Sequence, residues 1–353
     1  MQKMIKYPST DQFKAVVGNI LRQYNFVGLN EDGEAIYDGN RQKPVITFIG
    51  TVKLHGTNAA VCYNNHDGIW YQSRENVITP EKDNAGFAMF ASTKESVFTS
   101  IINAIANDNG VDLNEHTISL YGEWAGGNIQ KKVGIANIPK SFFIFGAKVS
   151  KPDDEDFVSF WIENIAKYSS VEDRIYNIND FKTYEVTVDF NVPQASVNRI
   201  IEITQEIEKC CPVAQAFGFD GIGEGVVFTA FVNGNRCTFK SKGEEHAVGG
   251  KVKTVKPVDN EKVAKIIEVA EKVTPVWRLD QMLTQACDLQ NGGHIERRKM
   301  GDYIKLIIQD IVKEDSDIIG EAGLDMKEIN SKVSDIAKRY FFTREDDEVG
   351  LGG

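Results

Sequence analysis

A lysine followed three residues later by glycine lies between two apolar runs near the start of the chain. Lys53 and Gly56 lie in the sequence TVKLHGTN, residues 51–58. The β-rich runs 45–49 and 59–63 predict strands on either side, so we expect Lys53 at a tight corner between them. Gly56 has no Cβ, so it permits a sharp turn and close approach of a ligand. Desolvation of a half-buried lysine favours the neutral amine needed to form a covalent lysine adduct, although the pattern alone also fits a surface lysine before a turn.

Other polar and aromatic residues lie at or along predicted strands of the same region. They are Arg74, Glu123, Phe143 and Phe145, Glu224, and Lys240 with Lys242. Lys240 and Lys242 are two residues apart, so their side chains share a strand face and both could reach one phosphate. Glu224 suits a divalent metal, because Mg²⁺ prefers carboxylates, phosphates and water. Glu123 could accept hydrogen bonds from ribose hydroxyls, and an aromatic ring could stack on a base.

Together these groups supply what nucleotidyl transfer through a lysine adduct requires. In that chemistry the amine attacks the α-phosphorus of a nucleoside triphosphate, and positioning and charge neutralisation drive the reaction. Taken singly, each group could instead be a core aromatic, an exposed turn carboxylate or a member of a surface ion pair.

Length and composition are those of a globular protein with room for two domains. The chain has 353 residues, of which 42% are hydrophobic and 26% charged, and its net charge is -11. Such a charge argues against coating nucleic acid or an anionic membrane by bulk electrostatics, so a polyanion must be held locally. The segment 240–256, with five lysines against two glutamates, is the candidate basic patch.

Cysteine usage and hydropathy predict an intracellular protein. Five cysteines form no C-x-x-C pattern, which suits a reducing compartment and argues against a structural zinc site. Neither a long apolar run nor a signal-peptide core is present. We expect a monomer in the cytoplasm, of the host cell if the chain is phage-encoded, with no membrane partner.

The pattern of predicted secondary structure changes near Pro257. Up to residue 256 predicted strands and helices are mixed, whereas four amphipathic helical stripes follow it. We therefore expect one domain over residues 1–256 and a helical domain over 257–343. The acidic, glycine-rich end, 344–353, is predicted to be a disordered tail.

Residues 53–58, KLHGTN, resemble the nucleotidyl-lysine motif of ATP-dependent RNA ligases of the RNA ligase 2 family, the phage nick-sealing and RNA-editing type. YGEWAG at 121–126 followed by IQK at 129–131, EGVV at 224–227 and KSK at 240–242 resemble the later motifs of this family, in the same order. The resemblance implies an α+β fold: a nucleotidyltransferase (ATP-grasp-like) catalytic domain of antiparallel sheets with flanking helices, then a small all-α domain. DNA ligases and capping enzymes typically carry an OB-fold there.

The resemblance also implies a three-step reaction that uses ATP and Mg²⁺, or Mn²⁺ in its place. Lys53 would take AMP from ATP, pass it to an RNA 5′-phosphate, and release it when a 3′-hydroxyl seals the strand. The catalytic residues by matching position would be Lys53, Lys240 and Lys242. The nucleotide-binding residues would be Val52, Lys53, Asn58, Arg74, Glu123, Phe145, Val227, Lys240 and Lys242, with Glu123 on the ribose and Phe145 on the adenine. Glu224 would hold the metal, and His55 and Arg74 would contact RNA or phosphate.

Two positions depart from the family pattern. Gly146 stands where an aspartate often follows the stacking aromatic, so either Phe143 or Phe145 is the stacking residue. Thr229 stands where a basic residue often follows the fourth motif, which puts one triphosphate or RNA contact in doubt.

We predict a ligase for 3′-hydroxyl and 5′-phosphate RNA ends, best at nicks in duplex RNA. An A-form duplex is recognised by shape, phosphates and 2′-hydroxyls, so strong sequence preference is not expected. One alternative is a GTP-using RNA capping guanylyltransferase, which His55 and the helical C-terminal region disfavour. The other is a non-catalytic RNA-binding relic of the same fold, with Gly146 and Thr229 as signs of decay.

Overall fold

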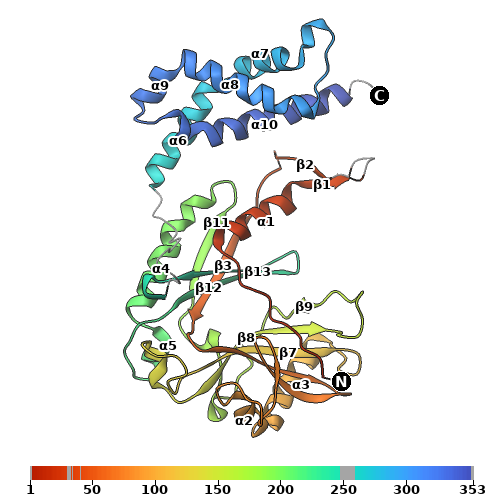
Figure 1. Cartoon of the computed structure of the whole chain (residues 1–353), viewed down its shortest axis with the longest axis vertical. Helices are drawn as coiled ribbons and strands as arrows, with labels where there is room; N and C mark the ends of the chain where they lie inside the picture. Colours follow the sequence, from red (N-terminus) through yellow and green to blue (C-terminus); the bar gives the residue numbers. More distant parts are fainter. Residues whose placement is uncertain (1, 30–32, 34, 40, 247–258, 351–353) are drawn as a thin grey trace. The chain divides into compact units, whose positions relative to one another are not determined.

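The computed structural model describes residues 2–29, 33, 35–39, 41–246 and 259–350, apart from the side chains of residues 260 and 346–350. The chain folds into two compact units, drawn in Figure 1. We name them the sheet unit, Met1–Gly18 with Val45–Lys256, and the helical unit, Asn19–Pro44 with Pro257–Gly353. Helix α1, Phe13–Asn25, begins in the first and ends in the second.

The sheet unit contains a smaller and a larger β-sheet. The smaller has the strand order β11-β3-β12-β13, with bounds Tyr184–Asp189, Val45–Lys53, Gly225–Val232 and Asn235–Lys242. The larger has the order β10-β8-β7-β4-β5-β6, and β9 pairs with β8. From β4 to β10 its strands are Thr57–Asn64, Gly68–Ser73, Val77–Ile78, Thr117–Ala125, Ser141–Ser150, Phe160–Trp161 and Ile175–Asn177. Strands β8 and β10 are parallel, and the other paired strands are antiparallel.

A short corner connects the two sheets. Strand β3 ends at Lys53 in the smaller sheet, and β4 begins at Thr57 in the larger one. A Cβ at Gly56 would lie 2.3 Å from the carbonyl oxygen of Trp124 and 2.9 Å from the Cβ of Ala125. Only glycine fits so close to the backbone of β7, and the corner therefore places Lys53 where the chain leaves one sheet for the other.

Helices cover both sheets. Helices α2, Phe87–Ser92, and α3, Glu95–Asn109, pack on the larger sheet through a buried apolar cluster that includes Phe98 and Phe142. Helix α4, Val197–Lys209, packs against the smaller sheet, and α5, Pro212–Ala216, follows it. The α+β class with antiparallel sheets and flanking helices, predicted from the sequence, is confirmed.

The N-terminal segment, Lys3–Asp11, lies against strands of both sheets. The amide of Ile5 donates to the side chain of Gln72 on β5 at 3.2 Å, and the Tyr121 hydroxyl on β7 donates to the Ile5 carbonyl at 2.7 Å. Asp11 forms a bridge with Phe239 on β13. This segment therefore contributes side chains to the space between the sheets.

The structure differs from the expected domain 1–256 at residues 19–44, which belong to the helical unit. This stretch holds most of α1 and the antiparallel pair β1, Phe26–Leu29, and β2, Ala35–Tyr37. One of its contacts within the helical unit is Gly39 beside the side chain of Arg339. The sequence could not assign the stretch, because the residues of a short hairpin do not identify the part of the protein against which it packs.

The rest of the helical unit consists of helices α6 to α10. Their bounds are Asn260–Val273, Val276–Cys287, Met300–Glu314, Ser316–Glu321 and Met326–Gly350. The prediction of disorder over 344–353 is wrong as far as Gly350, because α10 continues to that residue. Glu345 on this last stretch pairs with Arg297 at 3.2 Å, which ties the helix end to the unit. Residues 351–353 and the lysine-rich stretch 247–256 lie outside the described residues. No helix among the described residues is both long and apolar enough to cross a membrane.

A buried arginine joins three helices of this unit. Arg278 on α7 is 2% exposed. Its Nε donates to Asp310 on α8 at 2.7 Å, and its Nη1 contacts both Asp315 and the carbonyl oxygen of Val273 at the end of α6. A buried cation is tolerated only when paired in this way, and removing one partner leaves the others uncompensated.

Replacing Arg278 by methionine should therefore destabilise the helical unit. We expect the free energy of unfolding to fall by about 3 kcal/mol, since the two aspartates lose their partner. A urea titration followed by far-ultraviolet circular dichroism measures this. The matched control is Lys313→Met, because Lys313 is 78% exposed and pairs with Glu314 on the surface; it should shift stability by less than about 0.5 kcal/mol. Equal midpoints for both variants would contradict the assigned role.

Candidate active site

A cavity of about 600 Å³ opens in the sheet unit, which is a size suited to a small-molecule ligand. The predicted residues that line it are Val52, Lys53, Asn58, Arg74, Glu123, Phe143, Phe145, Val227, Lys240 and Lys242. The fold thus gathers around one cavity residues that span almost two hundred positions of sequence. His55 and Glu224 are not among the lining residues, and Glu224 contacts both Lys53 and His55.

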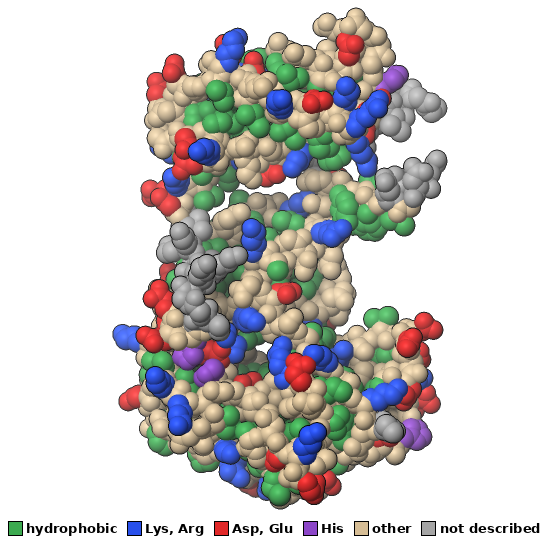
Figure 2. Space-filling view, in the orientation of Figure 1, with side chains coloured by type: hydrophobic (Ala, Val, Ile, Leu, Met, Phe, Trp, Pro, Cys, Tyr) green, Lys and Arg blue, Asp and Glu red, His purple; other side chains and the backbone are tan. Residues whose placement is uncertain are grey.

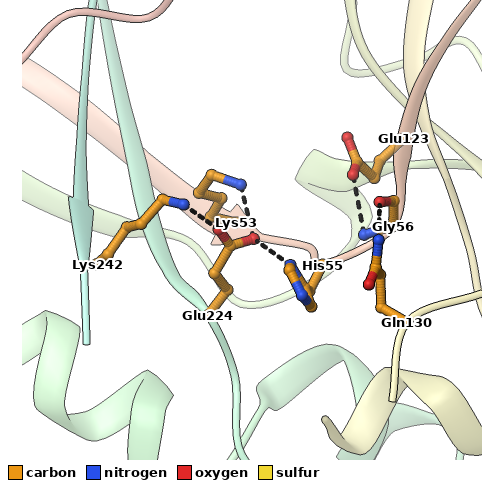
Figure 3. Close-up of polar contacts among 7 residues, drawn as sticks. All are labelled: Lys53, His55, Gly56, Glu123, Gln130, Glu224 and Lys242. Carbon is orange, nitrogen blue, oxygen red and sulfur yellow. Dashed lines mark hydrogen bonds and ion pairs between the residues drawn. The ribbon is translucent and has the colours of Figure 1, made fainter. Parts of the chain in front are cut away.

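The carboxylate of Glu224 binds three side chains at once (Figure 3). Its Oε2 lies 2.6 Å from the Nζ of Lys53 and 3.2 Å from the Nδ1 of His55. Its Oε1 lies 2.6 Å from the Nζ of Lys242. Glu224 is only 2% exposed, so this buried charge is neutralised by the two lysines.

Strand register explains why these side chains meet. Gly225 on β12 lies opposite Lys53 on β3 and also opposite Lys242 on β13. The three positions form one row across three neighbouring strands, with Glu224 immediately before the row. A Cβ at Gly225 would lie 2.1 Å from the carbonyl oxygen of Ser241, so glycine is required where the chain enters β12.

The charges at this row favour an ionised Glu224. Burial alone would raise the pKa of Glu224, but Lys53 and Lys242 outweigh it and hold the pKa below its ordinary value. The sequence suggested that desolvation would favour the neutral amine of Lys53. In the structure the amine instead forms an ion pair with the carboxylate of Glu224, with its Nζ 2.6 Å from Oε2.

Glu123 on β7 contacts the corner from the larger sheet. Its Oε1 accepts a hydrogen bond from the amide of Gly56 at 2.9 Å, while the carbonyl of Gly56 accepts one from the side chain of Gln130 at 3.4 Å. Burial raises the pKa of Glu123 to about 7, against the opposing effects of Lys53 and the Gly56 amide. The residue therefore holds the turn and presents a carboxyl group to the cavity.

Lys240 is the lysine of this wall that carries no ion pair with a carboxylate among the residues described. Burial, then the nearby charges of Lys242, Lys53 and Arg74, lower its pKa. Arg74 is 49% exposed, and its one ion pair with a described residue, Glu75, spans 3.7 Å. An unneutralised cation at this position can accept an anionic ligand such as a phosphate.

The two candidate stacking residues have different surroundings. Phe143 is fully buried, and its ring stacks on Tyr176 with centroids 5.3 Å apart. Phe145 is partly exposed, and its ring meets the edge of Tyr7 at 5.2 Å. The ring of Phe145 is thus the more accessible to a ligand in the cavity.

Several residues of the cavity wall were not predicted from the sequence, among them Tyr7, Thr10, Glu163 and Arg236. Arg236 could have been found, because it lies four residues before Lys240 and so shares its strand face. Tyr7 and Thr10 could not have been found from sequence spacing, because only tertiary packing brings the N-terminal segment to the cavity. Figure 2 shows acidic and basic side chains interspersed over the visible face of the sheet unit.

The donor set suits a metal ion only with help from a ligand. Within the described ranges, no three or more His, Cys, Asp or Glu side chains are grouped to hold a metal. Glu224 offers one buried carboxylate, which is what Mg²⁺ uses when phosphates and water complete its shell. The protein residues therefore fit a metal that enters together with a phosphate ligand.

Replacing Glu123 by glutamine should change how stability depends on pH. The folded carboxyl group keeps its proton up to about pH 7, against a reference value of 4.5, so it contributes stability below pH 4.5 that is lost as pH rises to about 7. The variant lacks this dependence, and the difference between the two unfolding free energies should change by on the order of 3 kcal/mol across the window. Urea unfolding at a series of pH values measures it; a difference independent of pH would contradict the shift.

This chain is similar to known proteins both in sequence and in structure. The model of a family described as RNA ligase matches residues 46–242. A solved structure of a Naegleria gruberi RNA ligase mutant with AMP and Mn has a TM-score of 0.41 and 13% identity, covering 69% of this chain and 57% of that one. The structure of the same enzyme with PPi has a TM-score of 0.37 and 14% identity, covering 69% of this chain and 57% of that one. An apo mutant has a TM-score of 0.41 and 15% identity, covering 70% of this chain and 58% of that one. This chain thus spans less than two thirds of those structures. No curated protein matches.

Proposed function

Because this chain belongs to the RNA ligase family, whose model covers more than half of it, we propose that it is an ATP-dependent RNA ligase. It would join 3′-hydroxyl and 5′-phosphate ends, preferably at nicks in duplex RNA. The observation that carries this proposal is the carboxylate of Glu224 paired with both Lys53 and Lys242 beside a cavity of nucleotide size. Monomeric state and cytoplasmic location stay predictions from the sequence.

The first step would occur at Lys53. Its Nζ, released from Glu224 and deprotonated, forms a bond to the α-phosphorus of ATP while the bond to pyrophosphate breaks. Lys240, which has no carboxylate partner among the described residues, and Lys242 lie on the same strand face and neutralise the phosphate oxygens. Release of Lys53 from Glu224 is therefore a requirement of the chemistry.

The cavity wall would orient the nucleotide. Glu123 and Asn58 lie opposite each other on β7 and β4, within reach of ribose hydroxyls. The partly exposed ring of Phe145 would stack on the adenine, with Val52 and Val227 on neighbouring strands of the smaller sheet. Stacking combined with hydrogen bonds to the sugar fixes the α-phosphorus in front of the lysine.

Mg²⁺, or Mn²⁺ in its place, would be held by Glu224 together with phosphate oxygens and water. When bound, such an ion neutralises charge that develops on the phosphate. Glu224 cannot serve the ion and both lysines equally, so its engagement elsewhere would weaken the pair with Lys53. This gives the buried carboxylate a role in freeing the nucleophile.

In the two later steps AMP moves to the RNA 5′-phosphate, and the 3′-hydroxyl then attacks that phosphate and displaces AMP. Arg74, which is half exposed and lines the cavity, would contact RNA phosphate. His55 would act through Glu224, which it contacts at 3.2 Å. RNA would be recognised through shape and phosphates.

Lys53→Met should abolish covalent labelling. Purified protein, stripped of any existing adduct with pyrophosphate, is incubated with Mg²⁺ and ATP labelled at the α-phosphate, then denatured and counted. The wild type should carry label and the variant only background, because methionine has no amine to attack phosphorus. The control Lys167→Met changes a lysine that is 59% exposed and pairs with Asp108, and it should label normally. A labelled Lys53→Met protein would refute the assignment, and labelling by GTP rather than ATP would favour the capping alternative.

Sealing of defined breaks tests the substrate. A panel would place RNA or DNA on each side of a nick and include unpaired single-stranded ends. We expect RNA nicks to be sealed at least about tenfold faster than single-stranded ends, because the duplex holds both ends together. Failure of the wild type both to take up label and to join any substrate would instead favour the non-catalytic relic.

A further inference from the structure

Phe145 lies at a break in the sheet ladder. In the pairing of β7 with β8, Tyr121 lies opposite Gly146 and Gly122 opposite Ile144, so Phe145 has no residue opposite it. On the other edge of β8, pairing with β10 ends at Ile144 and pairing with β9 begins at Lys148. Such a bulge frees a residue from the regular ladder, so other contacts must fix the position of Phe145.

Arg236 supplies these contacts from the other sheet. Its Nη2 donates to the carbonyl oxygen of Phe145 at 3.4 Å, and its Nη1 donates to the hydroxyl of Tyr7 at 3.1 Å. The Tyr7 ring in turn meets the edge of the Phe145 ring at 5.2 Å. One side chain on β13 thus binds the backbone of Phe145 directly and its ring through the N-terminal segment.

Arg236 is itself held by an aromatic ring. Its guanidinium carbon lies 4.5 Å from the ring centroid of Trp161 on β9, within the range of a cation–π contact. No carboxylate forms an ion pair with Arg236 among the residues described. No ion pair among the described residues therefore competes with Phe145 for the guanidinium. Arg236 also lines the cavity.

Gly146 makes room for this arrangement. A Cβ at this position would lie 3.0 Å from the Trp161 ring and 3.8 Å from the Nη2 of Arg236. A larger residue would push the indole away from the guanidinium, and an aspartate would compete for the guanidinium with the carbonyl of Phe145. The departure from the family pattern at 146 is thus matched by Trp161 and Arg236.

We propose that Arg236 is a positioning residue for the nucleotide base, because it bridges the two sheets and fixes the bulged Phe145 in the cavity wall. The inference deepens the proposed function and rests on it, since it takes the base of ATP as the ligand of Phe145. Arg236 acts through Phe145 and Tyr7, whereas the phosphate contacts of Lys53, Lys240 and Lys242 do not depend on it.

The test compares Arg236→Met, Arg236→Lys and Gly146→Ala with the wild type and with Arg199→Met. Arg199 is the matched control, because it is 54% exposed and pairs with Glu202 on the surface of α4. Formation of the lysyl-AMP adduct is measured over a range of ATP concentrations. Inhibition by pyrophosphate, which has no base, is measured beside it.

Arg236→Met should raise the KM for ATP by about tenfold or more with little change in kcat, since hydrogen bonds from a charged group are lost. Arg236→Lys should not restore it, because lysine lacks the planar guanidinium that stacks on the indole while two separate nitrogens donate to Tyr7 and Phe145. Gly146→Ala should raise the KM in the same direction. Pyrophosphate inhibition should stay at the wild-type value for every variant.

An unchanged KM for ATP in Arg236→Met would overturn the inference and leave the proposed function standing. Equal weakening of ATP use and of pyrophosphate inhibition would also overturn it, because that pattern indicates general damage to the fold. A wild-type protein that forms no adduct with any ATP concentration would refute the proposed function, and the inference with it.

Discussion

A buried carboxylate between two lysines is the interaction on which the site depends. Glu224 is removed from water, and such a charge is costly unless it is paired on both oxygens. Lys53 and Lys242 supply that pairing from β3 and β13, the two strands that flank β12. Loss of either lysine would leave Glu224 with uncompensated charge, so the order of strands and the chemistry of the site constrain each other.

The sequence predicted the parts of this site that depend on local geometry. Lys240 and Lys242 share a strand face because side chains alternate along a strand, and Lys53 precedes a turn because Gly56 permits one. The pairing of Lys53 with Glu224, however, depends on β12 lying between β3 and β13. Residues so distant in sequence meet through strand order, which a single sequence does not reveal.

The two predictions that differ from the structure, the domain of residues 19–44 and the disorder at the end of the chain, have the same physical origin. Residues 19–44 were assigned to the first domain because they precede it, yet they pack in the helical unit. The end of the chain was expected to be disordered from its acidic composition, but α10 reaches Gly350 and Glu345 pairs with Arg297. In each case tertiary contacts outweigh a local tendency, and composition alone does not contain those contacts.

The two departures from the family pattern have different physical settings. At Gly146 the space is used: the indole of Trp161 approaches to the limit that a Cβ would allow, and Arg236 lies beside it. A position that had merely decayed would leave a gap, because nothing would maintain close packing around a lost side chain. Thr229 lines the cavity on β12, and no comparable substitute for its missing charge lies opposite it, since its partner on β13 is Thr238. The wall is therefore closely packed around Gly146, whereas the paired threonines at Thr229 and Thr238 bring no charge to it.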